Sequence, residues 1–469
     1  MSKLDFDKER KVSDFYLSEL PSYAAYDLLR KCSSYVDGLK LAQRKILWTM
    51  IENVPNPNTR TKTSQMAAQV ALKSNYLHGE ANLEGVIDTL AANYVGSNNY
   101  SYVDGHGNFG TRFSPEAAAG RYTYVSISPL LQILFNRFDR EIVANQEFEG
   151  DKIEPLFFVP IFPTIFLNPA NGISTGFKFQ INPRNPKDIV KYIQAVLNKS
   201  ARMPDPDKFI PYFKGFKGTT KLEVKIDPAT GEKSNEFINY GIIDKVTGTE
   251  LLISEIPITY SYEQYIKVLD RLIEKGIIVD YDDRSDPKND EFKFDVKVHR
   301  EFFKKNPDQE DWIKVFGLSK SLPEQLNCID ENNKIHEFGS IKEILDSFIE
   351  IRLKYYGIRK KYLIQKYTEE LKLNVSRYLW CKGIVEDTIK VRNVKKDDIV
   401  KQLEKIEKII KQDDSYNYLL NMSISSITKE KMVDLKEKVG ELKNLIVELK
   451  ATSEKDMWLK DLDEFQKYI

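Results

Sequence analysis

Cysteine and histidine are scarce in this chain of 469 residues, which has three cysteines and four histidines. Cys32, Cys328 and Cys381 lie far apart and are odd in number, so the sequence gives no sign of a disulfide framework. Unpaired cysteines fit a reducing compartment, and we therefore expect a cytoplasmic protein. Because histidines are few and the cysteines are scattered, the sequence also argues against a zinc site.

Long apolar runs and an excess of charge of one sign are absent as well. The N-terminal segment is charged from Lys3 onward, has no apolar run of the kind found in signal peptides, and no stretch of the chain is apolar enough to cross a bilayer. The 70 basic residues are balanced by 70 acidic ones. This balance excludes a protein coated in positive charge, but it allows a local basic groove that binds DNA.

Short helical segments fill the first third of the chain. Residues 44–50, 63–77 and 83–94 are helix candidates, and glycine-containing turns lie between them. Short helices joined by tight turns are typical of helix-turn-helix and winged-helix modules. We therefore predict a winged-helix domain over residues 1–150.

Prolines and alternating apolar residues mark the middle of the chain. From about residue 151 prolines become frequent, and residues 221–226 and 291–298 alternate apolar and polar side chains as strands do. We predict a mixed α/β domain over residues 151–338.

The last part of the chain is rich in lysine and glutamate and has two helical repeats. In residues 341–362 and 432–449 apolar side chains recur at steps of three and four, which is the pattern of a coiled-coil seam. We predict that residues 339–469 form an outgoing helix, a small globular tip and a returning helix. A further helical segment is expected in the tip, with apolar residues at Ile399, Leu403, Ile406 and Ile410.

Tyr122 is one of 25 tyrosines, and its neighbours single it out as a candidate nucleophile. The unperturbed pKa of a tyrosine is about 10, so a nearby cation is needed to favour the phenolate. Arg121 is adjacent and suits bidentate contact with a phosphate, and the small residues 117–120 would let a bulky backbone approach. The alternative is a half-buried aromatic side chain beside a surface arginine.

A series of short motifs runs along the chain. From the N-terminus they are residues 36–40, 43–45, 77–80, 95–99, 107–112, 121–122, 171–176, 213–219, 253–257, 418–422 and 458–465. Together they resemble the breakage-reunion region of type IIA DNA topoisomerases, in that family's order and over nearly the whole chain. Residues 95–99 and 109–112 resemble the eukaryotic enzymes more closely than they resemble gyrase.

This resemblance implies a multidomain α+β fold with a winged-helix (CAP-like) module, an α/β tower and a long antiparallel coiled coil ending in a helical dimerisation gate. Residues 1–150 would then hold the catalytic tyrosine, 151–338 would be the tower, and 339–469 would be the coiled coil and gate of a homodimer. Since the chain starts at the cleavage module and ends after the gate, it resembles the medium subunit of the bacteriophage T-even type enzyme. A phage-encoded chain would act in the bacterial host cytoplasm.

The resemblance also assigns roles at the catalytic centre. Tyr122 would attack a phosphodiester of double-stranded DNA and become joined to the 5′ end of the cut strand, so the enzyme would be an isomerase that acts by transesterification. Arg121 would hold the scissile phosphate. His78 would bond to this phosphate or assist proton transfer, and Arg44 would touch it too. A turn histidine and a solvated helix face around Arg44 are the alternatives.

Further DNA contacts are implied outside the catalytic centre. Ile173 would be an apolar wedge that kinks the duplex, at an unstacking cost on the order of a few kcal/mol; ordinary core packing is its alternative. Gly120, Pro169 and Ser174 depart from the family pattern, and we expect Gly120 to loosen the active-site backbone. The side chains that would contact the DNA backbone are Lys40, Gln43, Lys45, Lys62 and Arg112.

A partner subunit is expected to complete the enzyme. It would carry the ATPase and metal-binding domains, hydrolyse ATP and hold Mg²⁺ with its own acidic residues. Other classes stay open: a non-catalytic, architectural DNA-binding dimer, a coiled-coil scaffold, and an autonomous nuclease with a metal on the acidic residues of segment 280–286. Residues 105–110 match a dinucleotide-binding pattern, but Pro115 interrupts the helix that such a motif needs.

Overall fold

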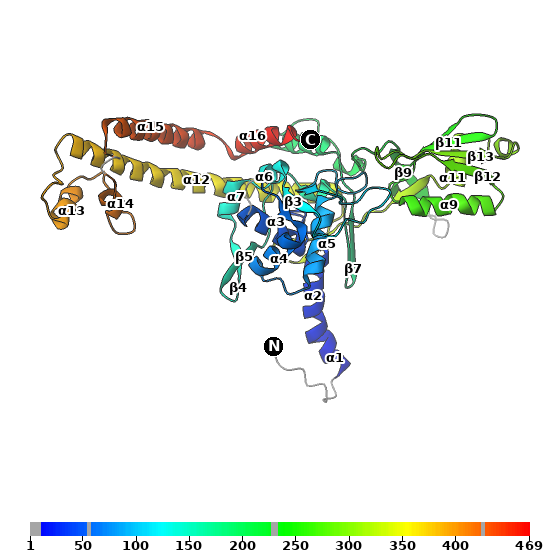
Figure 1. Cartoon of the computed structure of the whole chain (residues 1–469), viewed down its shortest axis with the longest axis horizontal. Coiled ribbons are helices and arrows are strands. Elements are labelled where there is room, and N and C mark those ends of the chain that lie inside the picture. Colours follow the sequence, from blue (N-terminus) through cyan, green and yellow to red (C-terminus); the bar gives the residue numbers. More distant parts are fainter. Residues whose placement is uncertain (1–10, 54–57, 227–232, 424–426) are drawn as a thin grey trace. The chain divides into compact units, whose positions relative to one another are not determined.

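The computed structural model describes residues 11–53, 58–226, 233–423 and 427–469 (Figure 1). The chain divides into two compact units: residues 1–352 with 461–469 form unit 1, and residues 353–460 form unit 2. Each unit has a hydrophobic core of its own. In the described ranges no helix combines the length and the apolar character needed to cross a membrane.

A winged-helix domain opens unit 1. Its elements are α3 (Leu41–Asn53), β1 (Thr61–Lys62), α4 (Thr63–Lys73), α5 (Glu80–Ala91), β2 (Val103–His106) and β3 (Tyr124–Ile127). The three helices pack together and against an antiparallel sheet with the strand order β1-β3-β2. The fully buried side chains of Ile46, Val70 and Ile87 lie on the inner faces of the helices. The three predicted helices are confirmed, although the second ends at Lys73.

An N-terminal helical run and two β-hairpins belong to the same unit. The run consists of α1 (Val12–Asp14), the π-helical turn η1 (Phe15–Glu19) and α2 (Leu20–Lys31). The elements after β3 are α6 (Pro129–Leu134), α7 (Arg137–Ile142), β4 (Asn145–Phe148), β5 (Asp151–Pro155), η2 (Thr164–Phe166), β6 (Ala170–Ser174) and β7 (Phe177–Ile181). Strands β4 and β5 form one hairpin, and β6 and β7 form the other. Helix α2 packs against β6, so the N-terminal run contacts the second hairpin.

The middle of unit 1 is a mixed α/β region, as the sequence predicts. Its antiparallel sheets have the strand orders β10-β11-β13-β12, β14-β9-β8 and β15-β16. The elements are α8 (Pro186–Leu197), η3 (Pro206–Lys208), β8 (Thr219–Ile226), β9 (Lys233–Tyr240), β10 (Ile242–Lys245), β11 (Glu250–Glu255), α9 (Tyr262–Glu274), β12 (Ile278–Asp283), β13 (Phe294–Val298), α10 (Phe302–Lys305), α11 (Gln309–Val315), β14 (Ser319–Leu322), β15 (Asn327–Ile329) and β16 (Ile335–Glu337). Tyr265 and Leu269 of α9 pack with Ile253 and Phe294 of the four-stranded sheet into one core.

Unit 2 is built from helices. It contains most of α12 (Ile341–Val385), then α13 (Lys396–Glu404), α14 (Asn417–Leu420), α15 (Lys429–Ala451) and the start of α16 (Glu454–Gln466). Helix α15 runs back beside α12 (Figure 1), and Lys438 pairs with Glu370 across them at 3.0 Å. Leu435, Leu442 and Ile446 are the buried positions of α15. The predicted antiparallel pairing of the two helices is therefore confirmed.

The tip of unit 2 differs from the sequence prediction. Helix α13 ends at Glu404, and both Ile406 and Ile410 lie in the irregular chain that follows. Leu403 and Ile406 pack with Trp380 in the small core of the tip. The prediction of a helix through Ile410 was wrong because short apolar clusters at helical spacing also suit irregular chain that covers a core.

Candidate active site

Tyr122 lies on a tight turn immediately before β3. The turn is closed by the backbone N–H of Tyr122, which donates to the carbonyl oxygen of Ala119 at 2.8 Å. The Tyr122 side chain is 70% exposed, and the guanidinium carbon of the exposed Arg121 lies 5.3 Å from the centre of its ring. The alternative of a half-buried aromatic side chain is therefore wrong, and the phenol is accessible to a large substrate.

The start of helix α4 fixes this turn on one side. The backbone N–H groups of Thr63 and Ser64 donate to the carbonyl oxygens of Thr123 and Gly120 at 3.1 and 3.2 Å, and the hydroxyls of Thr63 and Thr123 are 2.7 Å apart. Lys62 stands opposite Tyr124 in the β1–β3 ladder. The structure thus brings Lys62 to the edge of the sheet that presents Tyr122.

Gly120 tightens the turn, contrary to the expectation that it would loosen the backbone. Gly120 is buried, and a Cβ atom at this position would lie 2.8 Å from a carboxylate oxygen of Glu84 and 3.2 Å from the backbone nitrogen of Ser64. The absence of a side chain lets the turn approach α4 and α5 closely. The expectation was wrong because it considered backbone freedom and not the space available.

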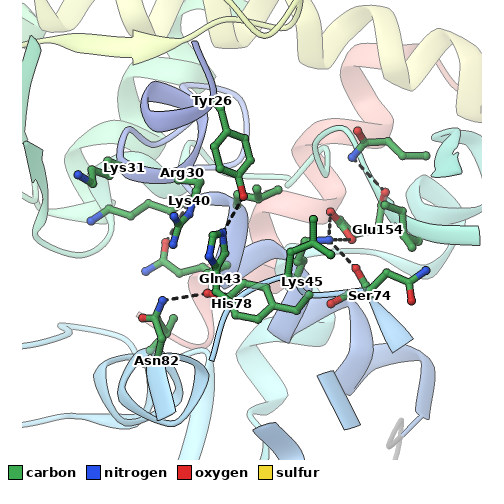
Figure 2. Close-up of a pocket in the computed structure, with 18 of the residues that line it drawn as sticks. Tyr26, Arg30, Lys31, Lys40, Gln43, Lys45, Ser74, His78, Asn82 and Glu154 are labelled. Atoms are coloured by element: carbon green, nitrogen blue, oxygen red, sulfur yellow. Dashed lines mark hydrogen bonds and ion pairs between the residues drawn. The ribbon is translucent and has the colours of Figure 1, made fainter. Parts of the chain in front are cut away.

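A cavity of about 570 Å³ gathers four of the predicted site residues: Lys40, Gln43, Lys45 and His78 (Figure 2). Its walls come from α2, from the start of α3, from the α4–α5 connection and from the β4–β5 hairpin. Tyr122 and Arg121 do not line this cavity. The structure therefore places the candidate nucleophile and the candidate phosphate-binding groups on separate surfaces of the winged-helix domain.

His78 is held in the cavity by two tyrosines. Its Nε2 atom lies 2.7 Å from the hydroxyl of Tyr26, and its ring meets that of Tyr76 edge-on with centroids 5.4 Å apart (Figure 2). Burial and the nearby charge of Arg30 lower the pKa of His78, which favours a neutral imidazole at neutral pH. Such a ring can donate or accept a proton.

Tyr26 and Arg30 are site residues that the sequence reasoning missed. Both line the cavity from α2, one helical turn apart, and so lie on the same face of the helix. Their spacing of four within a basic helix was the available signal. That signal is weak because most such faces only meet solvent.

Lys40 and Gln43 both line the cavity, and Gln43 also shapes the start of α3. The side-chain oxygen of Gln43 accepts a hydrogen bond from the backbone N–H of Lys40 at 2.9 Å. This bond satisfies an N–H at a helix start, where no carbonyl of the helix is available. Burial lowers the pKa of Lys40, whose side chain is directed toward the cavity in Figure 2.

Arg44 and Lys45 do not reach the surface, which corrects the predicted DNA contacts. The Nε and Nη2 atoms of Arg44 donate to the two carboxylate oxygens of the buried Asp37 at 2.7 and 3.0 Å. Lys45 is buried, and its Nζ donates to Glu154 and to the carbonyl oxygen of Ser74 at 2.9 and 2.7 Å. Both charges are used within the fold, because a buried cation needs a partner.

Arg112 was also predicted to contact DNA, and the structure places it in the protein interior. It is 4% exposed, pairs with Glu255 at 2.7 Å and donates to the carbonyl oxygen of Ile256 at 2.9 Å. Its guanidinium carbon lies 4.5 Å from the centre of the Phe292 ring. Arg112 therefore joins the loop after β2 to the end of β11 and is not free to bind a phosphate.

Ile173 projects from the β6–β7 hairpin into solvent. It is 73% exposed and stands opposite Lys178, close to the turn of the hairpin. The alternative of ordinary core packing is therefore wrong. An apolar side chain exposed to this degree is available to enter another molecule.

A resident metal site does not emerge from this chain. In the described residues no group of three or more histidine, cysteine, aspartate or glutamate side chains is placed to hold an ion. Within the acidic segment, Asp286 accepts from the backbone N–H of Lys288 at 2.9 Å, and Asp283 bonds to Tyr262. The described residues thus do not fit Mg²⁺, and no chemical step is derived through it.

Comparisons with known proteins agree with this architecture. The family model for the DNA gyrase/topoisomerase IV A-type chain matches residues 30–463. The mitochondrial DNA topoisomerase 2 of Dictyostelium discoideum is 31% identical over 98% of this chain and 35% of its own length. The DNA topoisomerase 2 of Invertebrate iridescent virus 6 is 29% identical over 99% of this chain and 40% of its own length.

A solved structure resembles this one over the same range. The crystal structure of the Plasmodium falciparum topoisomerase II DNA-binding, cleavage and re-ligation domain matches with a TM-score of 0.85 and 31% identity, over 97% of this chain and 64% of that chain. This chain spans little more than a third of the curated relatives quoted above. The match to residues 30–463 includes the Tyr122 turn, the cavity and most of both units, and the chain belongs to the DNA gyrase/topoisomerase IV A-type family, the cleavage domains of type IIA topoisomerases.

Proposed function

We propose that this chain is the DNA-cleaving part of an ATP-dependent type II DNA topoisomerase, in which Tyr122 makes a transient break in each strand of a duplex. The supporting observation is an exposed tyrosine beside an arginine, on a turn fixed to a winged-helix domain of a topoisomerase family. Paired breaks would let a second duplex pass. A non-catalytic architectural dimer is not favoured, because it gives no reason for an exposed Arg-Tyr pair at this turn.

The chemistry is an exchange of phosphoesters. The phenolic oxygen of Tyr122 attacks the phosphorus and displaces the ribose 3′-oxygen, so that one P–O bond forms as another breaks. The phenol gives up a proton, and the departing 3′-oxygen takes one up. Arg121 offsets the charge that develops on the phosphate. Because one phosphodiester replaces another, resealing needs no further energy source.

The cavity supplies groups for the DNA backbone beside the cut. Lys40 and Arg30 present positive charge there, and a neutral His78 can hydrogen-bond a phosphate oxygen or pass a proton. The Tyr26 hydroxyl orients the His78 ring. Lys62 offers a further backbone contact on the Tyr122 side, and Ile173 acts as the wedge that bends the duplex.

A complete enzyme is proposed to need more than this chain. Since this chain matches little more than a third of its curated relatives, we assign ATP hydrolysis and the Mg²⁺ ligands to a partner subunit, where the metal would stabilise the leaving oxygen. Two copies of this chain would dimerise through the helical tip of unit 2. A viral relative supports a phage or viral origin, and free buried cysteines fit a cytoplasmic setting.

The test mixes the chain with its ATPase partner, supercoiled DNA, Mg²⁺ and ATP, and then traps the intermediate with detergent. We expect linear DNA with protein on its 5′ ends from the unaltered chain and none from Tyr122→Phe. Tyr124→Phe is the matched control, because Tyr124 is another exposed tyrosine two residues away and should leave trapping unchanged.

Other outcomes identify the rival functions. Binding without any trapped break, even with the partner present, would support an architectural DNA-binding dimer. Cutting by this chain alone with Mg²⁺, and with no protein left on the DNA, would support an autonomous nuclease.

A further inference from the structure

Helix α2 and the turn of the β6–β7 hairpin meet at Asp27. One carboxylate oxygen of Asp27 accepts three hydrogen bonds from the turn: from the Ser174 hydroxyl at 2.9 Å, and from the Thr175 backbone N–H and hydroxyl at 2.9 and 3.0 Å. The other oxygen pairs with Lys31 at 3.0 Å. Asp27 is only 7% exposed, so these bonds are shielded from water.

The backbone of the hairpin also lies against α2, at the residue before Ile173. A Cβ atom on Gly172 would come within 2.1 Å of the Lys31 carbonyl oxygen, so only glycine allows this approach. Gly172 and Ser174 are the two neighbours of Ile173 in β6. The end of α2 therefore holds the backbone on both sides of Ile173.

The second strand of the hairpin has a different support. The side-chain amide of Asn327 donates to the Lys178 carbonyl oxygen at 2.8 Å, and Gln180 bridges to Gln325 through paired backbone bonds. These contacts hold β7 and leave the direction of the turn undetermined. Because an isolated two-stranded hairpin is marginally stable at best, the turn needs its own anchor.

We propose that Asp27 is a positioning residue for the Ile173 wedge: by gripping the turn, it fixes the direction in which Ile173 enters the duplex. This inference rests on the proposed function, in which Ile173 bends DNA. Asp27 does not touch DNA in this scheme, since its carboxylate is turned to the hairpin and to Lys31. Its loss should therefore weaken bending only as far as Ile173 produces bending.

The experiment measures bending of a duplex that carries a fluorescent donor and acceptor at its two ends, mixed with the full chain. We expect Ile173→Ala and Asp27→Ala each to reduce the bending equilibrium about tenfold, the scale expected when hydrogen bonds to a charged group are lost. The double variant should bend DNA no less than Ile173→Ala alone. Asp27→Asn, which keeps one acceptor oxygen and loses the charge, should lie between Asp27→Ala and the unaltered chain.

The matched control is Asp286→Ala. Asp286 also holds a hairpin turn, between β12 and β13, by accepting from the Lys288 backbone N–H at 2.9 Å, and it should leave bending unchanged. If Asp27→Ala melts early, the variant Ser174→Ala with Thr175→Val removes two of the same hydrogen bonds from the hairpin side. That variant should reproduce the loss of bending.

The proposal is overturned if Asp27→Ala bends DNA normally, or if it weakens bending equally in the Ile173→Ala background. It is also overturned if Ile173→Ala bends DNA normally, since Asp27 would then have no wedge to position. None of these results affects trapping through Tyr122, so failure of this inference is distinguishable from failure of the cleavage proposal.

Discussion

Arg44, Lys45 and Arg112 each lie buried against a carboxylate, whereas Arg121 reaches solvent. Removing one member of a buried pair leaves the other charge without a partner in a poorly solvated place, at a cost of about 3–5 kcal/mol. These three residues therefore stabilise the winged-helix domain and its neighbours. The positive charge available to DNA comes from other side chains, including Arg30, Lys40 and Arg121.

Arg112→Ala tests this division of roles. We expect the free energy of unfolding to fall by about 3 kcal/mol or more, because Glu255 is left buried and unpaired. Urea unfolding gives this value. Below the unfolding range, the slope of log Kd for DNA against log salt should not change, since Arg112 releases no counterions from DNA. Arg121→Ala is the contrasting variant, with unchanged stability and a shallower slope.

Asp88 gives a pH-dependent prediction. It lies on α5, one of its carboxylate oxygens is buried without a hydrogen-bond partner, and burial together with the Glu84 charge raises its pKa from 3.8 to about 6. The folded state therefore disfavours the charged form, and the penalty is full above pH 6 and absent below pH 3.8.

The variant Asp88→Asn removes this penalty. We expect it to stabilise the chain by about 1–2 kcal/mol at pH 8, after allowing for solvent screening, and not at pH 3.5. Thermal melts at the two pH values measure the difference. An equal gain at both would show that Asp88 acts by packing and not by charge.

Among the elements, helices were predictable from the sequence, and the ion pairs that join them were not. Apolar spacing indicated α3, α12 and α15, because each buries one face along its own length. The partner of Arg112 comes from β11, more than a hundred positions along the chain, so local spacing could not reveal it. The family resemblance placed Arg112 on DNA by position alone, whereas burial decides what its charge contacts.

The contact between α2 and β6 supports a prediction at the element scale. Gly172→Ala would place a methyl group against the Lys31 carbonyl oxygen, and backbone atoms cannot give way cheaply. We expect a loss of about 1–3 kcal/mol, the usual cost of overpacking, together with weaker DNA bending. Gly248→Ala is the control, since a Cβ there meets nothing within 4 Å. Equal melting temperatures for both variants would contradict the close contact.

At the scale of the whole molecule, the proposed dimer can be tested directly. Sedimentation equilibrium of the full chain should give twice the 54.4 kDa mass of one chain, at concentrations where DNA is cleaved with the partner present. A dimer is expected because two strands must be cut and each chain offers one Tyr122. A monomer that still makes double-strand breaks would contradict this arrangement.

The exposure of Ile173 has a consequence for the free protein. An apolar side chain that is 73% exposed stays hydrated until another molecule covers it, so it favours self-association when no duplex is present. A polar replacement would make the purified chain more soluble and also a poorer enzyme. Laboratory selection for soluble expression would therefore tend to remove this side chain, and a screen that reads solubility alone would select against activity.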